Sequence, residues 1–225
     1  MIINDRNFKV DKNIIKKCLE VTPATVGHYI DNVMNCEIKP IQEGVKIAGP
    51  AITVRCPTVD SNVDSTVVHY VMKFVQPGDI IVIDCCGDSE HASVGGMVAL
   101  MAKFKKAAGI IVDGAITDKI EIRKMGLPVF AKNVSALSTR LLGISGEINT
   151  SIQCGNVTVN PGDIIFGDDD GVVAFSPDIA DEILDKAKQS EIREVKLRNK
   201  LFEGELLADL SGATELIEKH LRKSK

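Results

Sequence analysis

Two apolar runs with one amphipathic segment between them form the most regular pattern in the chain. Residues 80–83 and residues 110–112 consist of Ile and Val only, and from residue 94 to residue 105 apolar residues recur every three or four positions. Continuous apolar runs are typical of strands buried on both faces. Apolar residues that recur every three or four positions, as in the segment between the two runs, are typical of a helix. The pattern predicts two parallel strands joined by a crossover helix.

The flanking segments predict the rest of an α/β chain with one domain, residues 1–225. N-terminal helices are expected at about 11–35, with a Thr22-Pro23 start for the second, and a helical extension at about 177–225, with a Ser176-Pro177 start. Other helices are expected from residue 64 and over 119–125, and other strands over 46–56 and 126–131.

A short internal repeat adds one more strand. Residues 76–84 are nearly repeated at 160–168, each copy carrying Pro-Gly-Asp before an apolar run. A turn of this kind delivers a buried strand, and two copies suggest two similarly built sheets. The acidic residues 168–170 lack the spacing of an EF-hand loop, so a hairpin turn is favoured there.

The loops after the two central strands are the candidate site. Ligands of parallel sheets usually bind at the carboxyl ends of the strands. Gly95 and Gly96 stand where the crossover helix begins, so an oxyanion could approach the free amides of its first turn. Asp118, in the next loop, is a hard oxygen ligand for a divalent cation. Alternatively, the glycines only permit a tight turn, and Asp118 caps the following helix.

Composition excludes several classes of partner. The chain has 225 residues, a formal net charge of −4 and 44% hydrophobic residues, which is typical of a soluble globular protein and a poor match for nucleic acid. Neither a signal peptide nor an apolar run of membrane-spanning length is present. We therefore expect a cytoplasmic protein with no nucleic-acid or membrane partner.

The six cysteines are expected to be free thiols. They include no C-x-x-C pair, and no His stands at zinc-ligand spacing. Cys85 and Cys86 begin the first site loop, so one is expected to be buried and the other to face the loop. Packing is favoured over thiol catalysis, because His91 is the only nearby base.

Several motifs in order resemble one known family. They are residues 49–54, Pro77-Gly78-Asp79, Gly95-Gly96, residues 109–115, residues 126–130, and residues 161–163 with 171–173. Together they resemble the regulator of ribonuclease activity A (RraA)-like family, which includes 4-hydroxy-4-methyl-2-oxoglutarate aldolases and oxaloacetate decarboxylases. The resemblance implies an αββα swivelling-domain sandwich with the central βαβ unit, and a homotrimer or hexamer with active sites between subunits.

The resemblance also implies a Mg²⁺ or Mn²⁺ cofactor and a small α-keto acid, or another oxyanion, as substrate. In family aldolases, an Asp-x20-Arg-Asp motif supplies an acid that assists a metal-bound water, an Arg that grips the substrate carboxylate, and an Asp that anchors the metal. The matching positions here are Gly96, Thr117 and Asp118. Only Asp118 fits, because Gly carries no base and Thr cannot make the bidentate grip of Arg.

The remaining site residues are assigned from the same resemblance. Asp118 is the expected metal ligand, and substrate is expected on the segment of Gly95, Gly96, Met97 and Val98 together with Thr117. His91, Asp88, Glu90 or Lys119 could replace the missing groups, and the family's acid from a neighbouring C-terminal helix corresponds to Glu191 or Glu194. With Asp118, the expected catalytic residues are His91 and Glu194.

The leading hypothesis is a metal-dependent lyase, of the aldolase or decarboxylase type, that cleaves a small α-keto acid through an enolate. The alternative is a non-catalytic regulatory or binding protein of the same family. A methyltransferase is disfavoured, because residues 87–90 lack the G-x-G loop of a nucleoside-methionine site.

Overall fold

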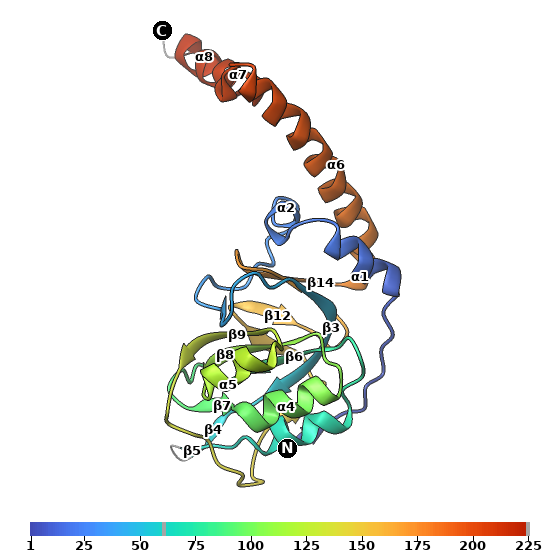
Figure 1. Cartoon of the computed structure of the whole chain (residues 1–225), viewed down its shortest axis with the longest axis vertical. Coiled ribbons are helices and arrows are strands. Elements are labelled where there is room, and N and C mark those ends of the chain that lie inside the picture. The colour runs from blue at the N-terminus through green and yellow to red at the C-terminus, as the bar shows by residue number, and fades with distance from the viewer. Residues whose placement is uncertain (60–61, 224–225) are drawn as a thin grey trace.

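The computed structural model describes residues 1–59 and 62–223. Its centre is a mixed β-sheet in which ten described strands are connected (Figure 1). Helices lie on one face of this sheet, and a short β-hairpin lies on the other. The α/β class and the central βαβ unit predicted from the sequence are confirmed.

Four parallel strands form the middle of the sheet. They are neighbours in the order β3 (Ile47–Arg55), β6 (Ile80–Asp84), β8 (Gly109–Ile116) and β9 (Val129–Val134). Alternate side chains of β6 enter different cores: Ile81 and Ile83 face one, and Ile80 and Val82 face the other. This two-sided burial explains why the strand reads as an uninterrupted apolar run.

Strand β3 connects the two copies of the Pro-Gly-Asp repeat. Its first half pairs antiparallel with β13 (Ile164–Gly167), and its second half pairs parallel with β6. In each copy the Asp caps its own turn: Asp79 accepts from the Gln76 amide, and Asp163 accepts from the Asn160 amide. The expectation of two similarly built sheets is wrong, because both strands share β3 in one sheet.

Short strands complete the described sheets. The hairpin of β13 with β14 (Val172–Phe175) confirms the turn expected at residues 168–170. The other short strands are β1 (Ile2–Ile3), β2 (Lys39–Pro40), β4 (Thr58–Val59), β5 (Asn62–Val63), β7 (Ala92–Val94), β10 (Glu147–Ile148), β11 (Ile152–Cys154) and β12 (Val157–Val159).

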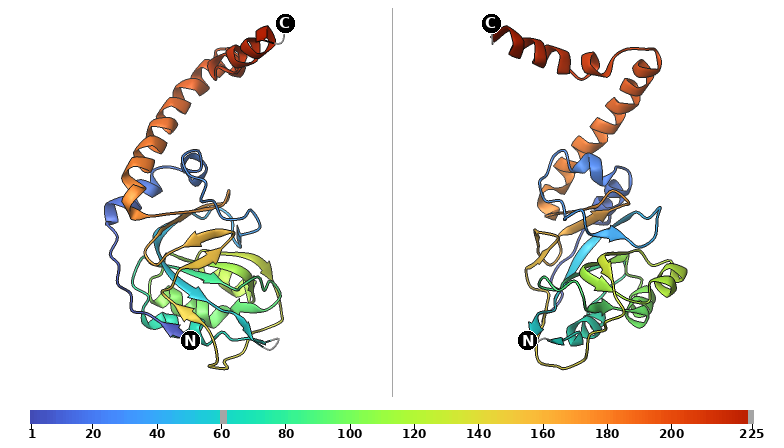
Figure 2. Two further views of the ribbon diagram at one scale, coloured as in Figure 1. Left: turned by 180° about the vertical axis from the view of Figure 1, so that it is seen from behind. Right: turned by 90° about the vertical axis from the view of Figure 1, so that its left-hand side faces the viewer.

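The helices form two groups. One face of the sheet is covered by α3 (Thr66–Tyr70), the 3-10 helix η1 (Val71–Lys73), α4 (Gly96–Phe104) and α5 (Lys119–Met125). A separate core against β13 and β14 is formed by α1 (Lys12–Leu19), α2 (Pro23–Val26) and α6 (Pro177–Phe202). The end of α6 projects away from the body and carries α7 (Leu207–Leu210) and α8 (Ala213–Lys223) with it (Figures 1 and 2).

Most helix starts agree with the sequence, and several ends do not. Ser176 caps α6 as expected, and α5 spans the expected residues. Helix α2 stops at Val26 instead of near residue 33, because the chain turns back and the Met34 amide bonds to the Val172 carbonyl of β14. The C-terminal tail forms two helices, because Gly212 between them has a positive φ of 78°. Across the described ranges, no helix combines the length and apolar character that crossing a bilayer requires.

The packing of β3 on the Pro77-Gly78 turn can be tested at Gly49, which lies against that turn. A Cβ on Gly49 would lie 2.2 Å from the Gly78 carbonyl oxygen, which is backbone and cannot rotate away. We expect Gly49→Ala to lower the free energy of unfolding by about 3 kcal/mol in urea titrations. Gly171→Ala is the matched control, because a Cβ there meets nothing within 4 Å. An equal effect of the two substitutions would contradict the packing of β3 on the turn.

Candidate active site

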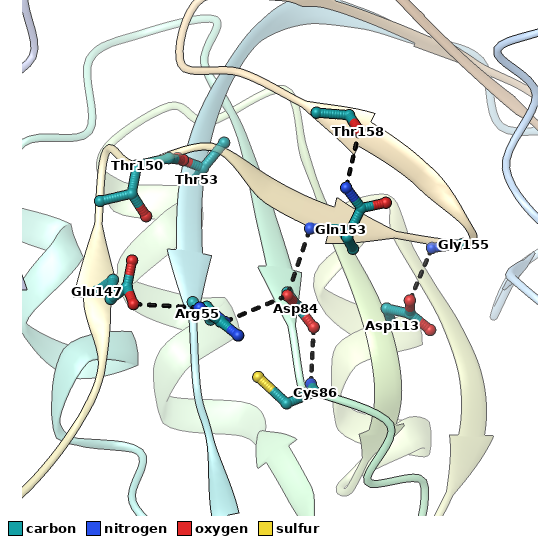
Figure 3. Close-up of polar contacts among 10 residues, drawn as sticks. All are labelled: Thr53, Arg55, Asp84, Cys86, Asp113, Glu147, Thr150, Gln153, Gly155 and Thr158. Carbon is teal, nitrogen blue, oxygen red and sulfur yellow. Dashed lines mark hydrogen bonds and ion pairs between the residues drawn. The ribbon is translucent and has the colours of Figure 1, made fainter.

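The pairing of β6 with β8 places two aspartates side by side, one at the end of β6 and one within β8. Asp84 and Asp113 are register partners in the parallel ladder. Asp84 accepts hydrogen bonds from the Cys86 amide at 2.7 Å and the Gln153 amide at 3.4 Å, and Arg55 Nε lies 3.8 Å from it (Figure 3). Its charge is therefore matched within the protein.

Asp113 is matched in the same way. It accepts from the Gly155 amide at 2.7 Å, and Lys132 Nζ lies 2.5 Å from its other oxygen. The hairpin β11–β12, which supplies the Gln153 and Gly155 amides, lies over this part of the sheet edge (Figure 3). Asp84 and Asp113 thus bind the hairpin to the sheet through hydrogen bonds. The candidate catalytic groups are in the loops that follow the two strands.

The two loops predicted to face each other do so. Strand β7, which the sequence analysis did not predict, runs parallel to the end of β8 and delivers the first loop to Gly95. The Thr117 amide donates to the Val94 carbonyl at 2.9 Å. The Gly96 amide donates to Asp118 Oδ2 at 2.8 Å. The start of α4 and the Asp118 carboxylate are therefore in direct contact.

Asp118 makes this contact from an uncommon backbone conformation. Its φ is 53° and ψ is 33°, in the left-handed region, and its carboxylate makes no capping bond to its own helix α5. The carboxylate caps α4 instead, where the positive end of the helix dipole favours it. The amides of Met97 and Val98 in the same first turn have no intrahelical acceptor. The sequence analysis expected every amide of the first turn of α4 to be free. This expectation is wrong for the Gly96 amide, which donates to Asp118.

A second carboxylate lies at the same helix start. A Cβ on Gly96 would lie 2.6 Å from Oε2 of Glu121, so this carboxylate fills the space that a side chain at position 96 would enter. Glu121 is one helical turn beyond Asp118, which puts both residues on one face of α5. The sequence analysis missed Glu121. Its spacing from Asp118 was the available signal, but only the fold shows that the same face meets Gly96.

Both glycines leave room for this close approach. A Cβ on Gly95 would lie 2.9 Å from Asp118 Oδ2 and 3.1 Å from Thr117 Cγ2. An open surface groove of about 490 Å³ lies along α5 and is lined by Asp118, Lys119, Ile120, Glu121 and Lys124, all of them residues of this helix and its cap. The groove combines acidic groups with two lysines, so a small anion and a cation could both be held there.

His91 belongs to the first loop but has a partner of its own. Its Nδ1 lies 2.8 Å from Asp88 Oδ2, and its amide also donates to Asp88. Burial opposes ionisation of Asp88, but the hydrogen bonds from His91 and Glu90 outweigh it and lower the pKa of the carboxyl. No described contact joins His91 to Gly96 or Asp118, so its catalytic role stays a prediction.

The cysteines of the first loop behave as expected for packing. Cys85 is buried and Cys86 is exposed, and every described cysteine is a free thiol. Burial raises the pKa of the Cys85 thiol to about 12, and burial also raises the pKa of Cys86 despite the nearby Arg55. Neither thiol is activated as a nucleophile at neutral pH.

Glu194 lies on α6, which projects from the end of the molecule away from α4 and α5 (Figure 1). It is exposed and pairs with Arg198 at 3.5 Å. Glu191, one turn earlier, accepts from the Thr22 amide at 2.7 Å at the start of α2. Neither acid meets Asp118 within one chain, so any part in this site requires a second subunit.

The donor set fits a magnesium or manganese ion that keeps part of its water. Among the residues that the structure describes, no three His, Cys, Asp or Glu side chains are grouped to hold a metal. Asp118 and Glu121 offer two carboxylates, and Mg²⁺ commonly binds through one or two carboxylates with water and substrate as the other ligands.

Comparison with known proteins decides the family. The RraA-like family model, described as Aldolase/RraA, matches residues 24–174. The chain belongs to this family. A Halalkalibacterium halodurans protein named "Putative 4-hydroxy-4-methyl-2-oxoglutarate aldolase" is 38% identical over 172 residues, covering 75% of this chain and 80% of that protein.

Solved structures show the same RraA-type fold. Streptomyces coelicolor RraAS2, described as an unusual member of the RNase ES inhibitor RraA protein family, has a TM-score of 0.76 and 27% identity, covering 85% of this chain and all of that one. A Geobacillus kaustophilus structure titled as an S-adenosylmethionine:2-dimethylmenaquinone methyltransferase has a TM-score of 0.60 and 27% identity, covering 68% of this chain and 93% of that one. The RraA-like resemblance seen in the sequence is confirmed.

The Asp118 cap can be tested by stability. We expect Asp118→Ala to lower the free energy of unfolding by about 2 kcal/mol, because it removes the α4 cap and places Ala in the left-handed region. Asp118→Asn should cost roughly 0.5 kcal/mol, because Asn keeps an acceptor oxygen and tolerates this conformation. Urea titration of both variants measures the difference, and equal stability of the two would contradict the cap.

Proposed function

We propose that this protein is a divalent-metal-dependent carbon–carbon lyase, of the aldolase or decarboxylase type, that acts on a small α-keto acid. The observation that carries the proposal is the Asp118 carboxylate against the Gly96 amide, with the exposed Glu121 carboxylate beside it. Family membership and the aldolase name of the 38% identical relative support the lyase class.

The chain's own residues divide the work as follows. Asp118 would hold Mg²⁺ or Mn²⁺, with water and substrate as the other ligands. The metal would supply positive charge that stabilises the electron pair left when the carbon–carbon bond breaks. The amides of Met97 and Val98, at the positive end of α4, would bind the carboxylate or enolate oxygen of the substrate. Thr117 would contribute a hydroxyl where family aldolases have Arg.

Glu121 also offers a replacement for the acid that Gly96 lacks. Its carboxylate already occupies the space beside Gly96, at the start of α4 where the substrate would bind. A carboxylate in this position can accept a proton from water or return one to the product. The absence of an acid at position 96 therefore does not leave the site without a base.

This role predicts a specific loss of activity. With Mn²⁺ we expect the protein to release pyruvate from oxaloacetate faster than Mn²⁺ alone, measured through a coupled lactate dehydrogenase. Glu121→Gln should lower kcat by roughly 10²-fold, the usual contribution of a proton-transfer group. Glu43→Gln, at another exposed Glu, should leave kcat unchanged.

The same assay tests the alternative function. Gly96 and Thr117 depart from the aldolase motif, and the Gly96 amide is already bonded to Asp118. These features favour a non-catalytic regulatory or binding protein of the RraA type. No pyruvate above the metal-only control, for oxaloacetate and for 4-hydroxy-4-methyl-2-oxoglutarate alike, would replace the lyase with that function.

The proposal includes a homotrimer or hexamer in which Glu194 of one subunit completes the site of another. The support is the projection of α6 from the body with exposed apolar side chains that the described part of its own chain leaves uncovered; they include Ile192, Val195 and Phe202.

Subunit mixing tests the shared site. Asp118→Ala and Glu194→Gln are each expected to be inactive. If each site takes Asp118 from one subunit and Glu194 from the next, random mixed oligomers regain about a quarter of wild-type activity, because both residues are intact at one site in four. Light scattering must show the same oligomer for each variant. Mixtures without recovery would place Glu194 outside the site.

A further inference from the structure

A second groove lies at the opposite edge of the sheet from the candidate active site. It has a volume of about 480 Å³ and runs between the segment of residues 6–16 and the turn before β6, with β3 at its base. That turn precedes β6, whereas the Gly96–Asp118 contact lies beyond the carboxyl ends of the same sheet. The groove is therefore independent of the proposed lyase chemistry.

One acid lines the groove, and it is neutralised. Asp79 is bound by Arg6 through two hydrogen bonds, Nε to Oδ2 at 2.9 Å and Nη2 to Oδ1 at 2.7 Å. The pair is largely buried, with side-chain exposures of 11% for Arg6 and 1% for Asp79. Arg6 also stacks over the ring of Phe8, which fixes its position. The remaining charge on the groove is thus positive.

Three lysines provide that charge. Lys9, Lys12 and Lys16 line the groove, all are exposed, and none forms an ion pair or hydrogen bond with another described residue. Lys12 and Lys16 are four residues apart in α1 and so lie on one side of the helix, and Lys9 lies in the segment that precedes it. Like charges at this spacing repel each other.

Lys17, the residue after Lys16, does have acidic partners. Lys17, on the other side of α1, bonds to Asp181 at 2.7 Å and to Asp185 at 3.0 Å. Those bonds to the carboxylates raise the pKa of Lys17. Helix α6 therefore supplies acids for the lysine of α1 that faces it, whereas no described residue supplies one for the three lysines at the groove.

The base of the groove is aliphatic. Val10 and Ile15 are half-buried along one side, and Ala48 and Pro50 of β3 are buried beneath them. No aromatic side chain lines the groove among the described residues, so a nucleobase would find no ring to stack on. The volume lies within the range of small-molecule sites, about 300–1,000 Å³. Positive rim and aliphatic base together match a small amphiphile.

We propose that this groove binds an aliphatic chain with an anionic head, such as a medium-chain carboxylate. The head lies among Lys9, Lys12 and Lys16, and the chain lies on Val10, Ile15 and Pro50. The ligand is a free small molecule, in keeping with a volume of about 480 Å³.

Calorimetric titration of the full-length protein with decanoate tests the site. We expect submillimolar binding that weakens with added salt. Lys12→Ala/Lys16→Ala should weaken binding at least tenfold, because both substitutions remove head-group charge. Lys219→Ala/Lys223→Ala is the matched control, with the same four-residue spacing on the exposed helix α8, and should leave the affinity unchanged. Decanol, which has the chain without the charge, should bind at least tenfold more weakly than decanoate.

Amide NMR shifts locate the ligand. They should concentrate in residues 6–16 and 76–79. Equal binding by the two double variants, equal binding of decanol, shifts elsewhere, or binding to anionic vesicles without binding to free decanoate would each overturn the proposal. None of these results depends on metal or on pyruvate release.

Discussion

The in-register parallel pairing of β6 with β8 is the constraint on which the candidate site depends. It places Asp84 opposite Asp113, so the loops that follow must leave the sheet at one edge. Two adjacent carboxylates would repel each other, and Arg55, Lys132 and the amides of the β11–β12 hairpin offset that repulsion. The hairpin covers Asp84 and Asp113, the first loop then passes through the exposed residues Cys86 and Gly87, and β7 carries it on to Gly95.

At that point, one carboxylate serves both folding and the proposed chemistry. Asp118 Oδ2 occupies the Gly96 amide, which a substrate oxyanion could otherwise use. A helix cap is worth about 0.5–2 kcal/mol, so a ligand that displaced it would lose at most roughly thirtyfold in affinity. The cap therefore orients Asp118 without blocking the site, and it explains why a left-handed Asp is held at the start of α5.

The local pattern of apolar residues predicted most strands and helices around the candidate site. Contacts between residues far apart in the sequence determine the rest. The apolar runs of β6 and β8 and the spacing of α4 and α5 gave those elements within a few residues, because each buries side chains at its own period. Strand β7 was missed because its three residues sit inside a polar loop, and α2 was overextended because Met34 pairs with β14. The facing of Gly96 and Asp118 followed from the βαβ order. The approach of Glu121 did not, since it depends on how α5 packs beside α4.

The groove beside Asp118 also indicates how a site without the family's arginine could hold a carboxylate. A guanidinium grips a carboxylate through two fixed, parallel hydrogen bonds, whereas an ammonium acts as a mobile point charge. Lys119 and Lys124 both line the groove, one near Thr117 and one further along α5. Two mobile point charges select less by shape and more by the total charge of the ligand.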